Sequence, residues 1–118
     1  MTCLAVGAIA ISLSGAAFSL HWTHSVEKEE WVERWSVQDQ GLLLEEARVK
    51  GSGAGMEPGE NARLVDGWWV WMPQTNVPFL MLAASGATGG GWKLCDENAC
   101  WTIGTDPSEA IRIAPCTP

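Results

Sequence analysis

Apolar and polar residues alternate over residues 17–28, which read AFSLHWTHSVEK. One side of an extended chain would carry Phe18, Leu20, Trp22, His24 and Val26. A period of two over this length predicts a half-buried β-strand. Both histidines of the protein, His21 and His24, lie in this segment and fall on its opposite faces.

Two more alternating segments follow. Residues 29–37 place Trp31 and Trp35 on one face as a strand, whereas a helix would stack the two rings one turn apart. The turn sequence QDQG at residues 38–41 favours the strand. The third segment, residues 42–50, carries on one side Leu42, Leu44, Glu46 and Arg48.

Shorter apolar stretches predict the remaining strands. They cover residues 67–72, 79–84, 92–95, 100–103 and 111–113. Short strands separated by turn residues are typical of an all-β domain. We therefore expect residues 1–118 to form a single-domain antiparallel β-sandwich or partly open barrel.

Residues 1–16, MTCLAVGAIAISLSGA, are apolar and small. A leader remnant is one interpretation, but no Lys or Arg precedes the apolar run as an export signal requires. The run is also too short to span a membrane. We interpret residues 2–13 as one buried first strand that turns at Ser14 and Gly15.

The net charge of −7 narrows the range of partners. Nucleic acid and anionic membrane surfaces both attract Lys and Arg, which are outnumbered here by Asp and Glu. The charge therefore predicts neither a nucleic-acid partner nor binding to an anionic membrane surface, and the short apolar run predicts no membrane span.

The cysteines are Cys3, Cys95, Cys100 and Cys116. An even number in a small domain indicates disulfides and a periplasmic or otherwise extracytoplasmic location. Cys95 and Cys100 flank the turn sequence DENA, so a hairpin would bring them within bonding distance. Free thiols and a zinc site are the alternatives, but zinc sites usually have tighter Cys or His spacing. Because the export signal is weak, a cytoplasmic location is the alternative to an extracytoplasmic one. We expect the Cys95–Cys100 disulfide, no metal and no cofactor.

The chain contains eight tryptophans and no tyrosine. Packing within the core and between strands accounts for most of them. In residues 67–72, however, Trp69 and Trp71 would share one face and Trp68 the other. An exposed indole there would suit a carbohydrate- or protein-binding module, which is one alternative function.

The candidate site lies on the charged side of the segment at residues 42–50. If the face of Leu42 and Leu44 is the core side, Glu46 and Arg48 must be paired or hold a ligand. If the register leaves them at a solvated strand end, they have no such role. An oriented Arg48 can clamp a carboxylate with two hydrogen bonds, and His24 would lie nearby.

A glycine-rich loop, residues 51–59, follows this strand. Its backbone N–H groups can face an anion, although it lacks the ending of a phosphate-binding loop. A hydrolase using His24 with Glu27 or Glu46 is the catalytic alternative. Within a strand His24 points away from Ser25 and Glu27, and no G-x-S-x-G elbow is present. We therefore expect a ligand site without catalytic residues, formed by His24, Ser25, Glu27, Glu46, Arg48, Gly53, Gly55 and Glu57.

Several of these segments resemble a small bacterial family of domains of unknown function, number eighteen-fifty. The segments are residues 21–28 with Trp31 and Trp35, residues 46–58, 66–69 and 85–88, and residues 92–95 with Cys100. Members of that family tend to be encoded beside permeases of TAXI-type TRAP transporters, which take up organic acids. The resemblance implies an accessory module in solute uptake, with a small organic acid and transporter components as partners. It implies no known reaction.

Overall fold

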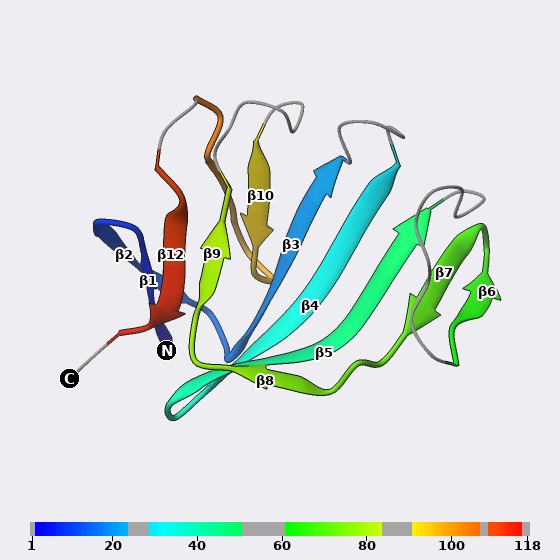
Figure 1. Cartoon of the computed structure of the whole chain (residues 1–118). Helices are drawn as coiled ribbons and strands as arrows, with labels where there is room; N and C mark the ends of the chain where they lie inside the picture. The colour runs from blue at the N-terminus through cyan, green and yellow to red at the C-terminus, as the bar shows by residue number, and fades with distance from the viewer. Residues whose placement is uncertain (1, 24–28, 51–60, 84–90, 107–108, 117–118) are drawn as a thin grey trace.

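Two antiparallel β-sheets pack face to face over an apolar core (Figure 1). This computed structural model describes residues 2–23, 29–50, 61–83, 91–106 and 109–116. Strands are the only regular elements within these ranges, so the predicted all-β class is confirmed. Neither sheet closes on itself, and the architecture is therefore a sandwich rather than a barrel.

The smaller sheet has four strands in the order β2-β1-β12-β9. They are β1 (Thr2–Val6), β2 (Ile9–Leu13), β9 (Leu80–Leu82) and β12 (Ile111–Pro115). Leu4, Leu13 and Ile113 from this sheet are fully buried in the core. The first and last strands of the chain therefore lie side by side in the same sheet.

The prediction of one strand over residues 2–13 is wrong. The chain turns back at Gly7 and Ala8, so that Leu4 lies opposite Ile11 in a β1–β2 hairpin. Gly7 has a φ of 59°, a left-handed conformation that glycine adopts without steric cost. The apolar run conceals this turn because both strands of the hairpin send residues into the core.

The larger sheet runs β11-β10-β3-β4-β5-β7-β6, with β8 paired to β5 beside this path. Its strands are β3 (Ala17–Thr23), β4 (Glu30–Gln38), β5 (Gly41–Lys50), β6 (Arg63–Val65), β7 (Trp68–Trp71), β8 (Thr75–Val77), β10 (Trp92–Cys95) and β11 (Cys100–Ile103). The sequence predicts β4 as a strand rather than a helix, and this is confirmed. It does not predict β6 and β8, which have only three residues each.

A β-bulge interrupts the pairing of β4 with β5. Arg34 pairs with Glu46, but the next residue, Trp35, pairs with Leu44, so Glu45 has no partner on β4. The carbonyl of Glu45 instead accepts a hydrogen bond of 3.0 Å from the side chain of Gln74. The bulge lies where β5 changes partner from β8 to β7.

This bulge reverses the alternation of side chains along β5. Leu42 faces the core before it, whereas Ala47 and Val49 face the core after it. Glu46 and Arg48 consequently lie on the opposite face, with 23% and 36% of their side-chain surfaces exposed. The prediction that these charges share a face with Leu42 is wrong, because strict alternation does not allow for an extra residue.

Seven of the eight tryptophans lie on the core side of the larger sheet. They are Trp22, Trp31, Trp35, Trp69, Trp71, Trp92 and Trp101. The ring of Trp22 stacks on Trp31 with centroids 5.8 Å apart, and it meets Trp92 at 4.7 Å. Trp68 lies on the opposite face, as the alternation within residues 67–72 predicts.

Two disulfides cross-link the fold. Cys95 and Cys100 are cross-strand partners and close the β10–β11 hairpin, as expected from the sequence. Cys3 is bonded to Cys116 and so joins β1 to the residue that follows β12. Both bonds are compatible with an extracytoplasmic location. In the described ranges, no helix has the length and apolar character needed to cross a membrane.

Candidate functional site

We call the side of the larger sheet that carries Trp68, away from the core, the outer face. Directly opposed residues of paired strands share a face, so the strand register assembles a row across it. The row consists of Thr102, Lys93, His21, Val32, Arg48, Val70 and Arg63. Seven strands, from β11 to β6 in sheet order, thus contribute neighbouring side chains.

Positive charge gathers on the outer face, although the chain as a whole is acidic. Of the six Lys and Arg residues that the structure describes, five lie there: Arg34, Arg48, Lys50, Arg63 and Lys93. The sixth, Arg112, lies on the smaller sheet and packs over the ring of Phe79. Two carboxylates lie on the same face: Glu30, opposite Thr23, and Glu46, opposite Arg34. The outer face is therefore locally cationic.

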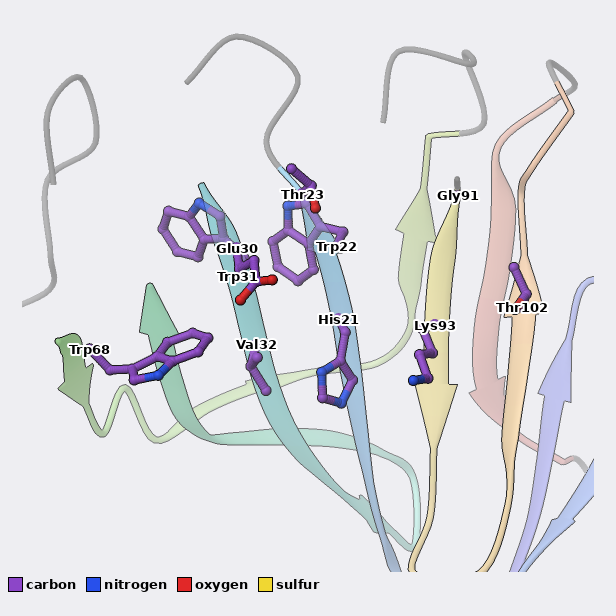
Figure 2. Close-up of a pocket in the computed structure, with 10 residues that line it drawn as sticks. All are labelled: His21, Trp22, Thr23, Glu30, Trp31, Val32, Trp68, Gly91, Lys93 and Thr102. Atoms are coloured by element: carbon purple, nitrogen blue, oxygen red, sulfur yellow. The ribbon is translucent and has the colours of Figure 1, made fainter. Parts of the chain in front are cut away.

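A cavity of about 500 Å³ opens on this face. Figure 2 shows Trp68 at one end and Lys93 at the other, with Val32 and His21 between them. Thr102 of β11 extends the polar end beyond Lys93. Trp22 and Trp31 also line the cavity, near Thr23 and Glu30. The cavity thus has Trp68 at one end and hydrogen-bond donors at the other.

His21 occupies the middle of the cavity and is held by a neighbour on its own strand. Its Nε2 lies 2.8 Å from the hydroxyl oxygen of Ser19, at hydrogen-bonding distance. Burial lowers the pKa of His21 below its ordinary value, the ammonium of Lys93 lowers it further, and Glu30 opposes both effects. The imidazole is therefore mainly neutral at pH 7 and can donate one hydrogen bond and accept another.

Arg48 is fixed by two partners. Its Nε and Nη2 both donate to one carboxylate oxygen of Glu46, at 3.2 and 2.7 Å. Its guanidinium carbon lies 5.9 Å from the ring centroid of Trp68, and the Nζ of Lys50 lies 5.7 Å from the same centroid. Cations this close to an indole are attracted by its π-electrons. The expected orientation of Arg48 by Glu46 is thus present, but it occurs on the outer face.

Lys93 differs from Arg48 in its surroundings. Its side chain is exposed, and it has no ion-pair partner within the described part of the chain. An unpaired ammonium beside a neutral imidazole and the hydroxyl of Thr102 offers several donors to one anionic group. The arrangement is suited to binding a carboxylate.

The other predicted site residues cannot be compared with this geometry. His24, Ser25, Glu27, Gly53, Gly55 and Glu57 lie outside the described residues. The proposal that they surround a ligand stays a prediction. Of the predicted ligand-binding set, the structure therefore places Glu46 and Arg48 alone.

The ligand-binding set predicted from the sequence omits three residues of the cavity, His21, Trp68 and Lys93, and it omits Ser19, which contacts His21. The hydroxyl of Ser19 and the ring of His21 are two positions apart, so strand periodicity alone places them on one face. The alignment of Lys93 with His21 depends on the pairing of β10 with β3, which local patterns do not reveal.

Metal binding has no support in the ranges that the structure describes. No three His, Cys, Asp or Glu side chains come together there in a way that could hold an ion.

Comparison with known proteins gives one match. The family model described as "Domain of unknown function (DUF1850)" matches residues 18–103, which include every residue of the cavity. No curated protein and no solved structure matches the chain.

Proposed function

This chain belongs to the DUF1850 family of domains of unknown function, and we propose that it is a non-enzymatic module that binds a small organic anion on its outer face. The observation that carries the proposal is the position of Lys93, which has no ion-pair partner among the described residues, beside neutral His21 in a cavity of about 500 Å³. Cavities of this size hold small molecules.

Electrostatics supports an anionic ligand over a cationic or neutral one. Lys93, Arg48 and Lys50 surround the cavity or its aromatic end, against the carboxylates of Glu30 and Glu46. Clustering cations on one face of an acidic protein raises the local concentration of anions there. Solubility does not require such a cluster of cations, because the net charge of −7 already supports it.

A role beside TRAP-type uptake systems is part of the proposal. Such transporters move organic acids, and an organic-acid site on a partner domain would fit that role. Co-purification of the tagged domain with a TAXI-type permease or its solute-binding protein tests this association. Retention of neither component in the presence of an organic acid would count against it.

An acyl-transfer enzyme is the second candidate, because the Ser19 hydroxyl lies 2.8 Å from a neutral imidazole. This distance suits a nucleophile and its base. However, within the described residues no carboxylate accepts a hydrogen bond from the His21 ring and so orients it. A fluorophosphonate probe discriminates between the candidates: covalent labelling at Ser19 would favour the enzyme, and a binding module stays unlabelled.

Calorimetric titration with a panel of carboxylates tests the binding proposal. We expect at least one to bind at pH 7, and we expect Lys93→Ala to weaken that binding at least tenfold, as for loss of a charge-assisted contact. Arg112→Ala, which removes a cation from the smaller sheet, is the matched control and should bind normally. Absence of binding by every carboxylate, or equal loss in both variants, would overturn the proposal.

A further inference from the structure

The two ends of the cavity are chemically different, and this difference restricts the ligand. Three strand-to-strand steps separate Lys93 on β10 from Arg48 on β5. At about 4.8 Å per step, their backbones are about 14 Å apart. The indole of Trp68 lies against Arg48 and so marks the far end of this span, with His21 and Val32 as the floor between (Figure 2).

The charges favour a ligand with one anionic group. Lys93 lies at the polar end and has no ion pair within the ranges that the structure describes, whereas Arg48 is already neutralised by Glu46. Glu30 also lines the cavity and is close enough to His21 to affect its pKa. A second carboxylate on the ligand would therefore meet repulsion from Glu30 and find no unpaired cation at the centre of the cavity.

The aromatic end favours a flat apolar group. Trp68 is the one tryptophan on the outer face, and the other seven serve the core side of the sheet. The cations of Arg48 and Lys50 lie 5.9 and 5.7 Å from its ring centroid and are attracted to its π-electrons. A positioned indole next to the half-buried Val32 provides a surface on which a ring can stack.

We propose that the site takes an aromatic monocarboxylate, with its carboxylate on Lys93 and its ring on Trp68. This inference rests on the proposed function, since it assumes that the outer face binds anions. It narrows the class by excluding small dicarboxylates, because Glu30 in the cavity repels a second carboxylate and such ligands carry no ring to stack on Trp68. A short linker between ring and carboxylate is required, because the floor formed by His21 and Val32 separates the two ends.

Isothermal titration with four probes tests the assignment: 3-phenylpropionate, propionate, succinate and 3-phenylpropylamine. We expect 3-phenylpropionate to bind about tenfold more tightly than propionate or succinate, which is the scale of one aromatic contact. The amine, which has the same ring and the opposite charge, should not bind. Lys93→Ala should weaken binding of 3-phenylpropionate and propionate alike.

Two variants of Trp68 separate stacking from structural effects. Trp68→Leu should lose the preference for 3-phenylpropionate over propionate, whereas Trp68→Phe should keep most of it. Thermal unfolding of both variants shows whether the fold is intact, and the Phe variant keeps the test valid if the Leu variant does not fold.

The failures of the two proposals are distinguishable. If no carboxylate binds, the proposed function fails and the present assignment fails with it. If propionate or succinate binds as tightly as 3-phenylpropionate and binding needs Lys93, anion binding stands and the aromatic assignment is overturned. An unchanged ligand preference in folded Trp68→Leu would overturn it as well.

Discussion

The indole Nε1 of Trp35 donates a hydrogen bond of 3.1 Å to the carboxylate of Glu33 on the core side of β4. Glu33 lies between Leu20 and Ala47 in the strand register, both of which are buried. Burial raises the pKa of Glu33, and the hydrogen bond from Trp35 opposes that rise without cancelling it. The folded protein therefore favours the protonated acid at this position.

This predicts that Glu33→Gln stabilises the protein at neutral pH. Because the pKa is raised on folding, the contribution of Glu33 to stability is complete below its unfolded value and is lost as pH rises through the folded value. A neutral amide avoids that loss and still accepts from Trp35. Urea unfolding should show a gain of about 1 kcal/mol at pH 7.5, the scale of a poorly compensated buried polar group, and a smaller gain near pH 4.

Glu97→Gln is the matched control for this prediction, because it removes the same charge from an exposed turn. An equal gain in both variants would show that the effect comes from net charge and not from the environment of Glu33.

Asp96 provides a prediction with the opposite sign. Its carboxylate accepts hydrogen bonds from the backbone N–H groups of Ser14, Asn98 and Ala99, and these bonds, led by that of Ser14, lower its pKa. A lowered pKa stabilises the fold above the unfolded value, and this is lost as pH falls through the folded value. Asp96→Asn should therefore lower the melting temperature at pH 7 and make less difference near pH 2.

Asp106→Asn serves as the control for Asp96→Asn, since Asp106 is an exposed carboxylate elsewhere in the chain. Differential scanning calorimetry at both pH values measures the effect. A loss in Asp96→Asn that does not depend on pH would contradict the assigned cause.

The two disulfides should contribute unequally to stability. Cys3 and Cys116 are 113 positions apart, whereas Cys95 and Cys100 are five apart. Loop-closure entropy predicts about 5 kcal/mol for the long loop and about 2 kcal/mol for the short one. Paired Cys→Ser variants compared by chemical denaturation check this order. Equal losses would indicate that local contacts, rather than chain entropy, set the contributions.

Ligand binding should depend on the charge of His21. The charged groups that face it are Lys93 on β10, and Glu30 and Arg34 on β4. Burial and Lys93 lower its pKa, and a bound carboxylate would raise it again. Affinity for 3-phenylpropionate should therefore increase about two- to fivefold from pH 7.5 to pH 5.5, the scale of an exposed ion pair.

His21→Gln checks the source of this pH dependence, because it keeps a hydrogen-bonding side chain that does not titrate in this range. Titration calorimetry should give a nearly flat profile for the variant. A profile as steep as that of the unmodified protein would assign the proton to another group.

Local alternation predicts the strands well where pairing is regular. In β4, Trp31 and Trp35 share the core side of the sheet as their spacing predicts, because nothing interrupts the strand between them. The β10–β11 hairpin is likewise predictable, since its turn residues and its cysteines are adjacent in the sequence.

The errors arise where one residue changes the phase or direction of the chain. Glu45 adds a position to β5 and moves Glu46 and Arg48 to the outer face, and Gly7 folds one predicted strand into two. Neither residue differs visibly from others in similar sequence contexts. The outer-face site is harder still to predict from the sequence, because Lys93 is paired with His21 although the two residues are far apart in the chain.

The bond between Cys3 and Cys116 makes nearly the whole polypeptide a covalent ring. A protease that cuts once anywhere between these residues would leave the two pieces tethered, and the nicked molecule would run as one band until a reductant is added. The protein can thus outlast a single cleavage event.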